Sequence, residues 1–371
     1  MLPNTFASKF LITLFAMIVV STSRVTMATE TETQQEDTAA IPQFTSEIAR
    51  IDGLANGYGG GNSWLAAAEG HREQIEDRLK TEPETAQDDD FVVFSNGYLY
   101  GKAWLLDYLP PEFFEKTPHG EAALNSIKTT KKWLDSLGVH LLVVPVPPRM
   151  EVTPTSVFKE HVDLPHRIHF IRTLLEHGVH TLDVLPMFTE EQSRTGLSLS
   201  LKTDSHYSNA GVRILALEIA NSIAPYTPPP GDDIALEYST RGIQTDIKSA
   251  FTKHIQDGSP VKFPPYETAE AYSVSDANGL PFKPAKSSSI LVAGDSYTYI
   301  FQNVSGHLPA HLALEMKQPI SHVAMGGGGA TVPNRLARMG KEEVAKFDVV
   351  VWVFTARYLT RPGWDKNPLT D

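Results

Sequence analysis

Cysteine is absent from the 371 residues of this chain. Without a thiol the protein forms no disulfide, no thiolate zinc site and no iron–sulfur cluster, and it uses no cysteine nucleophile. A chain without disulfides needs no oxidative folding, so the composition is compatible with an oxidising compartment without requiring one.

Basic residues are scarce relative to acidic ones. Lys and Arg number 32 against 44 Asp and Glu, which gives a formal net charge of -12. This balance disfavours duplex nucleic acid as a partner, because binding to phosphates needs clustered basic side chains. It leaves neutral and anionic polymers open as substrates, since a local basic groove suffices for them. Hydrophobic residues make up 41% of the chain, enough for a sizeable core.

Apolar runs of membrane-spanning length are missing after the start of the chain. At the start, Lys9 precedes an apolar run from Phe10 to Val20, and the small residue Ala28 is followed by a polar stretch. This layout predicts a secretory signal peptide over 1–28, with an uncleaved N-terminal anchor as the alternative. Either interpretation puts the rest of the chain outside the cytoplasm, so we expect a periplasmic protein, soluble or tethered by that segment.

Residues 29–90 are expected to form an N-terminal arm that is partly disordered, because 29–43 is rich in Thr, Glu and Gln. Ser63 is a candidate cap for a helix in this arm that runs to about Leu79. A catalytic domain is expected over 91–371. It carries an irregular insertion at about 225–288, which is rich in Pro, Ser and Asp and is expected near the site.

Strands and helices alternate through the catalytic domain. A hairpin over 91–100 is predicted to turn at Asn96-Gly97. Buried strands are expected at 139–146, 179–185, 289–293, 320–325 and 349–354, and helices at 122–137, 166–177, 208–223, 309–316 and 332–346. The alternation predicts an α/β fold with a parallel sheet and helices on both faces.

Ser296 is the candidate nucleophile. It follows the strand predicted at 289–293 in the stretch Gly294-Asp295-Ser296-Tyr297. The carboxyl edge of a parallel sheet is where open α/β folds place their sites, and backbone N–H groups at such a turn can face an oxyanion. The alternative role for this serine is a plain helix cap.

A serine hydroxyl needs a base, and Asp204 and His206 are the candidates to supply one. Residues two apart in an extended or turning backbone project to the same side. Asp204 can then accept the Nδ1–H of His206 and leave Nε2 for Ser296. The alternative is a surface aspartate beside a histidine that starts a helix.

A glycine run follows the strand predicted at 320–325. Gly327 and Gly328 are candidate oxyanion donors, because glycines permit close backbone approach. A loop that must turn tightly explains the glycines equally well. No Gly-Lys-Ser/Thr follows, so the run is not a P-loop.

Several stretches, taken in order, resemble the SGNH-like acetyltransferases of exopolysaccharide export, the alginate O-acetyltransferase AlgJ/AlgX family. They are Gly97 to Tyr100, Val144 to Arg149, Thr203 to Tyr207, Gly294 to Tyr297 and Phe354 to Leu359. The resemblance implies an SGNH-hydrolase-like sheet and a catalytic set of Asp204, His206 and Ser296. Ordinary GDSL hydrolases place the serine block first. Here it comes last, which is the circularly permuted order of the acetyltransferase family.

The chain departs from the family pattern in three places. Arg149 stands where the family often has Lys, and Ala356 stands where an acidic residue is expected. The sequence ends at Asp371 without the carbohydrate-binding module of one branch. We therefore expect the single-domain, AlgJ-like branch, with alginate as substrate left open.

Arg149 and Arg357 are candidate contacts for an acidic sugar or for the acetyl donor. The alternative is a salt bridge at the sheet edge, which we favour for Arg357. We expect no metal and no cofactor. His307 and His311 are four residues apart, but Pro309 between them argues against a ligand-bearing helix.

Three functions remain from the sequence. The preferred one is an exported O-acetyltransferase that moves acetyl groups to polysaccharide hydroxyls through an acetyl-serine. It would work with a membrane acetyl-donor protein and other export components. A carbohydrate acetylesterase would use the same residues with water as acceptor. A non-catalytic polysaccharide-binding component is the third, and the intact Asp204, His206 and Ser296 count against it.

Overall fold

The computed structural model describes residues 44–57, 63–81, 86–153, 157–158, 162–228, 237–249 and 266–364, short stretches between 251 and 264, and residues 366–369. The expected leader at 1–28 lies outside these residues. Among the described helices, none is long and apolar enough to cross a membrane.

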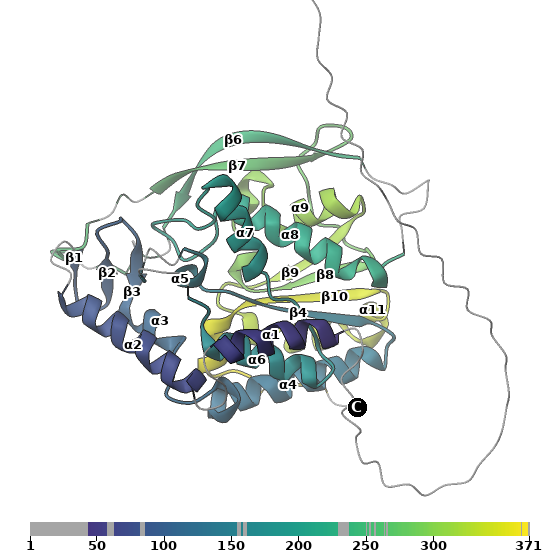
Figure 1. Ribbon diagram of the computed structural model, residues 1–371. Coiled ribbons are helices and arrows are strands. Elements are labelled where there is room, and N and C mark those ends of the chain that lie inside the picture. Colours follow the sequence, from purple (N-terminus) through teal and green to yellow (C-terminus); the bar gives the residue numbers. More distant parts are fainter. Residues whose placement is uncertain are drawn as a thin grey trace, which may run out of the picture. The chain divides into compact units, whose positions relative to one another are not determined.

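A parallel sheet forms the centre of the molecule, with strand order β5-β4-β10-β8-β9. Figure 1 labels β4, β10, β8 and β9 of this sheet. The bounds of these strands are β4 His140–Val146, β5 His180–Thr181, β8 Ile290–Gly294, β9 Ile320–Ala324 and β10 Val349–Thr355. Every neighbouring pair in the sheet is parallel, as the alternating pattern predicts.

Helices cover both faces of this sheet, which confirms the expected α/β architecture. Their bounds are α1 Thr45–Gly57, α2 Ser63–Thr81, α3 Lys102–Asp107, α4 Pro118–Asp135, α5 Arg149–Val152, α6 Pro165–Glu176, α7 Leu185–Thr195, α8 Asn209–Ile223, α9 Leu308–Met316, α10 Val332–Met339 and α11 Lys341–Val344.

Successive strand residues point into two separate cores. Leu141 and Val143 of β4 pack with α4, α6 and α10, whereas Leu142 and Val144 pack with α7, α8 and α9. This alternation explains the near-continuous apolar runs, because a strand buried on both faces has no polar side.

Helix ends follow local chemistry. Thr117 caps α4 by accepting the N–H of Gly120, and Ser208 caps α8 by accepting that of Gly211. Beyond the end of α4, Gly138 adopts φ 74°, a left-handed conformation that costs glycine little.

The segment 225–288 is more regular than expected. It contains a long antiparallel ribbon of β6, Tyr238–Lys248, and β7, Tyr266–Asp276, paired from end to end. The ribbon buries Ile247, Ala271 and Val274 against the core of α8 and α9, while most of β6 is solvent-exposed. Because the ribbon buries so few apolar side chains, its sequence has no clear apolar alternation, and the two strands were not predicted.

Two smaller expectations were also inaccurate, and a third is confirmed with an addition. The helix expected at 332–346 breaks into α10 and α11 at Gly340, which has φ 83°. The strand expected at 179–185 shrinks to β5, because Asp183 accepts the Leu185 N–H and starts α7. The hairpin at 91–100 is confirmed as β2 Phe91–Val93 and β3 Leu99–Gly101, and a third strand, β1 Ala86–Gln87, joins it.

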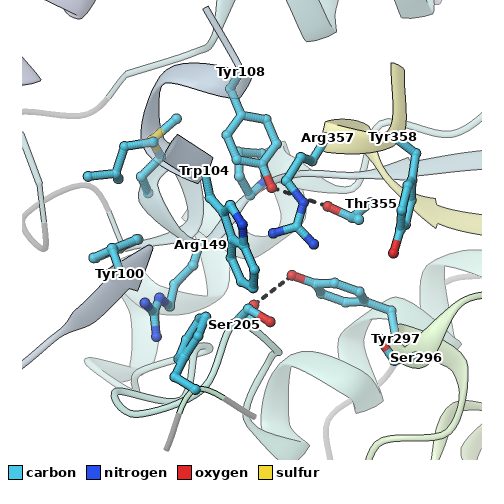
Figure 2. A pocket seen from close by; sticks show the side chains of 14 residues that line it. Tyr100, Trp104, Tyr108, Arg149, Ser205, Ser296, Tyr297, Thr355, Arg357 and Tyr358 are labelled. Atoms are coloured by element: carbon cyan, nitrogen blue, oxygen red, sulfur yellow. Dashed lines mark hydrogen bonds between the residues drawn. The ribbon is translucent and has the colours of Figure 1, made fainter. Parts of the chain in front are cut away.

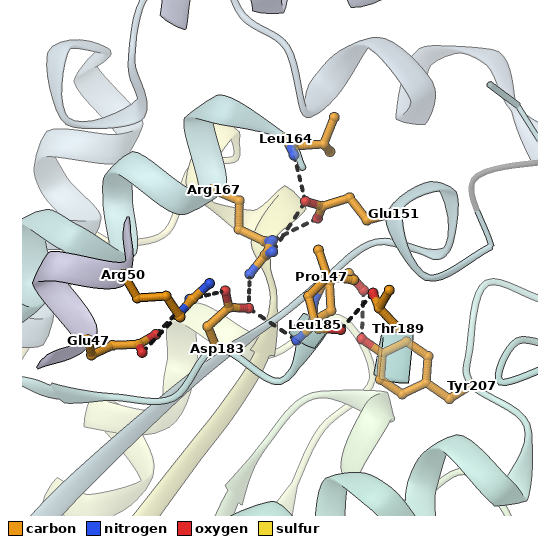
Figure 3. Close-up of polar contacts among 10 residues, drawn as sticks. All are labelled: Glu47, Arg50, Pro147, Glu151, Leu164, Arg167, Asp183, Leu185, Thr189 and Tyr207. Atoms are coloured by element: carbon orange, nitrogen blue, oxygen red, sulfur yellow. Dashed lines mark hydrogen bonds and ion pairs between the residues drawn. The ribbon is translucent and has the colours of Figure 1, made fainter. Parts of the chain in front are cut away.

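Helix α1 was not expected, and it ties the N-terminal arm to the domain. Its Arg50 bonds Glu47 and the buried Asp183, which also accepts from Arg167 at 2.7 Å (Figure 3). Arg167 in turn bonds Glu151 on α5 at 2.7 Å. Both acidic partners of Arg167 are buried, so each needs the arginine to offset its desolvation.

Candidate active site

Ser296 lies where β8 ends at the carboxyl edge of the sheet. Gly294, the last strand residue, is pressed against β10, and a side chain there would lie 2.0 Å from the Val353 carbonyl oxygen. The chain then enters a short 3-10 turn, Ser296–Thr298. Ser296 is half-buried and borders a pocket.

Asp295 holds this turn in place through hydrogen bonds to two backbone N–H groups. Its fully buried carboxylate accepts the N–H of Tyr297 at 2.9 Å and the N–H of Thr355, at the end of β10, at 2.8 Å. Burial raises the pKa of this carboxyl group, and the two backbone bonds oppose the shift. The turn that carries Ser296 is thereby attached to the neighbouring strand.

His206 and Asp204 lie in the segment between α7 and α8. They do not directly follow a strand of the sheet, unlike Ser296. The Nε2 of His206 lies 2.7 Å from the Oγ of Ser296. Its Nδ1 bonds Oδ1 of Asp204, and the same oxygen accepts the His206 backbone N–H at 3.1 Å. The structure thus brings the three predicted residues into one hydrogen-bonded chain.

Two tyrosines pack beneath this chain. The Tyr297 hydroxyl donates to the Ser205 carbonyl at 2.6 Å, and its ring lies 4.8 Å from that of His206. The Tyr207 hydroxyl donates to the Pro147 carbonyl at 2.6 Å. Burial raises the pKa of both tyrosines, so they remain neutral donors.

A pocket opens beside Ser296 and is largely aromatic (Figure 2). It encloses about 500 Å³, part of it open to solvent. Its aromatic walls are Tyr100, Trp104, Tyr108, Phe251, Tyr297 and Tyr358. The sequence interpretation quoted Tyr100, Tyr297 and Tyr358 only within the stretches of family resemblance. It assigned a pocket role to none of the six, because they come from separate segments of the chain.

For Arg149 the sequence left a ligand contact and a salt bridge open, and no salt bridge of Arg149 is among the ion pairs of the described residues. Arg149 is 3% exposed and donates to backbone carbonyls of Leu201 at 2.8 Å and Lys202 at 3.0 Å, and to those of Asp204 and Leu99. Its guanidinium also lies 4.1 Å from the centre of the Tyr100 ring. Arg149 therefore braces the segment that carries Asp204, although it also borders the pocket.

Arg357 extends into the pocket beside Trp104, with its guanidinium carbon 3.8 Å from the ring centre (Figure 2). The salt bridge expected for Arg357 is not among the ion pairs of the described residues, where the nearby Arg361 pairs with Asp107 instead. A guanidinium that faces a pocket without a carboxylate partner can receive an anionic or polar ligand group.

The two candidate glycines differ. Gly328 donates its N–H to the Met325 carbonyl at 2.9 Å, so this group is committed to the turn and not to an oxyanion. Gly327 has φ 72°, which glycine adopts at little cost, and a side chain there would lie 3.4 Å from the Tyr358 hydroxyl. The glycine run thus reaches the pocket wall at Tyr358.

Within the described residues, no group of acidic and histidine side chains is arranged to hold a metal ion. His307 and His311 are both 1% exposed. Burial lowers the pKa of each to about 3, which keeps both rings neutral.

The fold and this geometry define an SGNH-like α/β domain with a serine, a histidine and an aspartate in line. The family model described as "SGNH hydrolase-like domain, acetyltransferase AlgX" matches residues 103–356, more than half of the chain. The chain belongs to this AlgJ/AlgX-type family of SGNH-like acetyltransferases.

Solved structures share the fold. The O-acetyltransferase domain of Pseudomonas putida AlgJ is 17% identical with a TM-score of 0.55, over 76% of this chain and 94% of that one. Pseudomonas aeruginosa AlgX is 17% identical with a TM-score of 0.53, over 76% of this chain and 63% of that one. At this identity the likeness supports the fold alone. No curated protein matches the chain by sequence.

Proposed function

We propose that this protein is an exported O-acetyltransferase that acetylates polysaccharide hydroxyls through an acetyl-Ser296 intermediate. The observation that carries the proposal is the 2.7 Å contact between His206 Nε2 and Ser296 Oγ, with Asp204 on the other ring nitrogen, at the mouth of an aromatic pocket. Membership of an acetyltransferase family supports the choice of an acetyl group.

Two half-reactions account for the transfer. The Oγ of Ser296 attacks the acetyl carbonyl while His206 takes its proton and then gives it to the leaving group. A sugar hydroxyl next attacks the acetyl-serine and loses its proton to His206. Ser296 leaves as the alcohol when that proton returns. Asp204 holds the imidazole in the tautomer that both steps need.

The oxyanion of each tetrahedral intermediate needs N–H donors. The backbone N–H of Ser296 is the first candidate, because no acceptor in the described part of the chain is bonded to it. Gly327 is the second, since its loop borders the pocket wall. Arg357 then contacts a polar or acidic group of the donor or the sugar, as the arginine that faces the pocket.

Acceptor choice separates transfer from hydrolysis. Water is present at roughly 55 M, and a sugar wins only if the pocket orients it; effective molarities of about 10⁵ M or more are attainable by positioning. We expect the Ser296 peptide to gain one acetyl group from an activated acetyl ester and to lose it when an oligosaccharide is added, with acetylated sugar appearing in the mass spectrum. Discharge to acetate at one rate with every sugar tried would replace the transferase by an acetylesterase.

Export is part of the same proposal, together with a membrane acetyl-donor protein and other export components as partners. It rests on Lys9, the apolar run from Phe10 to Val20 and Ala28. A C-terminally tagged chain is expected in the periplasmic fraction, free or tethered. A purely cytoplasmic pool would contradict export while leaving the chemistry untouched.

A further inference from the structure

We propose that Arg149 and Glu267 are positioning residues that clamp the segment 201–204 from two sides and so hold His206 against Ser296. The inference rests on the proposed function, since it assigns a role in the same reaction. It adds the β6–β7 ribbon, through Glu267, to the parts of the fold on which turnover depends.

The segment between α7 and α8 has little regular structure to hold it. A single antiparallel bridge joins Ser200 and Tyr207 at its two ends. Backbone groups between these ends need partners other than a helix or sheet, because unpaired polar groups are costly when buried. Backbone groups supply some of them, since the Leu201 N–H donates to the His206 carbonyl at 3.1 Å and the Leu99 N–H donates to the Lys202 carbonyl at 3.0 Å. The hydroxyls of Ser249 and Tyr297 donate to the carbonyls of Thr203 and Ser205. The charged partners are two side chains of opposite sign, Arg149 and Glu267.

Arg149 bonds backbone carbonyl groups of the segment. Its guanidinium donates to the carbonyls of Leu201, Lys202 and Asp204, and on its other side to Leu99 of β3. A guanidinium carries only donors, so it fixes carbonyl groups and cannot bind N–H groups.

Glu267 bonds backbone N–H groups of the same segment. Its Oε1 accepts the N–H of Lys202 at 3.0 Å, and its Oε2 accepts both the N–H and the hydroxyl of Thr203 at 2.8 Å. An ionised carboxylate carries only acceptors. Hydrogen bonds to charged groups are roughly twice as strong as neutral ones, so the two side chains set which way the backbone faces.

These bonds to 201–203 also restrict the catalytic residues that follow them in the chain. With 201–203 fixed, Asp204 and His206 project toward Ser296 from a backbone that has few ways to rotate. Glu267 does not border the pocket, whereas Arg149 does. A loss of turnover on changing Glu267 therefore reports alignment and not lost substrate contact.

Glu267→Gln is the decisive variant, because an amide offers one acceptor oxygen where the carboxylate offers two, and its NH₂ would face an N–H. Glu270→Gln is the matched control: the same change on the same strand, at an exposed carboxylate bonded only to the Tyr272 hydroxyl among the described residues. We expect kcat with an activated acetyl ester to fall about 10- to 100-fold in Glu267→Gln, with KM changed less than about threefold. Glu270→Gln should match the wild type.

A spectroscopic readout separates alignment from stability. The Nδ1 proton of His206 in its bond to Asp204 gives a downfield proton signal, identified by its loss in His206→Ala. We expect this signal to shift or broaden in Glu267→Gln and in Arg149→Lys, and to stay unchanged in Glu270→Gln. Thermal melting shows that each variant is folded at the assay temperature. If Glu267→Gln is not folded there, Glu267→Asp, which keeps the charge but shortens the reach, takes its place with an expected loss of kcat below tenfold.

The clamp is refuted if a folded Glu267 variant keeps kcat within twofold of the wild type and leaves the His206 proton signal in place. Failure of the proposed function looks different, because Ser296→Ala would then retain turnover. An inactive Ser296→Ala beside a fully active Glu267→Gln removes the clamp alone.

Discussion

Tyr297→Phe tests whether the Tyr297 hydroxyl helps to align His206 with Ser296. Its bond to Ser205 is a second link between the two parts of the site, besides the contact of His206 with Ser296. The change removes one hydroxyl, which donates to the Ser205 carbonyl at 2.6 Å, and keeps the ring against His206 and Tyr207. The ring is 5% exposed, so packing is preserved and the lost bond is what is measured.

The magnitude follows from that single bond. A neutral hydrogen bond contributes about 0.5–1.5 kcal/mol net, so the free energy of unfolding should fall by about 1 kcal/mol. Because His206 follows Ser205 directly, a small shift of the carbonyl moves the imidazole. Misplacement by about 1 Å can cost a hundredfold in rate, and we expect a fall in kcat of about tenfold for a smaller shift. KM should change little, since the hydroxyl is bonded to the protein.

The assay pairs urea unfolding with turnover of an activated acetyl ester, and Tyr272→Phe is the control. That variant also loses a hydroxyl bond, to Glu270 at 3.1 Å, but an exposed one, and should change stability by less than about 0.5 kcal/mol and leave turnover unchanged. If Tyr297→Phe loses about 1 kcal/mol and keeps full kcat, the hydroxyl stabilises the fold without aligning the site, and the reasoning fails.

Two further predictions concern the proposed chemistry and the buried histidines. Ser296→Ala and His206→Ala should each lower acetyl-ester turnover by several orders of magnitude, and the double variant should be little worse than either, because the groups act as one unit; additive losses measured in steady-state kinetics would contradict this. His307 and His311 have folded pKa values lowered to about 3 by burial, against about 6.5 when unfolded, so their contribution to stability is complete above pH 6.5 and is lost as pH falls toward 3. Each should cost about 1.4 kcal/mol per pH unit below 6, measured by urea unfolding, and His311→Leu should reduce that slope; an unchanged slope would show that the ring is protonated in the fold.

The sheet was predictable because its signal is local. Strands such as β10, Val349–Thr355, are buried on both faces and appear as unbroken apolar runs, and capped helices between them leave few topologies open. The β6–β7 ribbon was not predictable in this way, since it buries one face only in part and its strands carry many charged and polar residues.

Only those residues of the candidate site that stand in short, recognisable stretches of sequence could be predicted. Ser296 and the pair Asp204 and His206 each stand in one recognisable stretch, and the structure brings them together. Glu267 and Trp104 lie far from these stretches along the chain, and only the folded backbone places the first on 202–203 and the second under Arg357. Side chains whose role is to hold a backbone carry no spacing signal.

Two aspartates beside the site show how environment divides one residue type between two roles. Asp295 is adjacent to Ser296 in sequence, yet both of its oxygens accept backbone N–H groups, from Tyr297 and Thr355, and it is completely buried. An aspartate so committed cannot orient an imidazole. Asp204 lies 92 residues before Ser296, and it is the carboxylate that reaches His206 Nδ1. Asparagine at 295 would leave one buried N–H unpaired and disturb the turn, whereas asparagine at 204 would change the partner of the imidazole. Thermal melting and turnover should therefore distinguish the two substitutions. Asp295→Asn is expected to lower stability and activity together, whereas Asp204→Asn is expected to lower activity with little loss of stability.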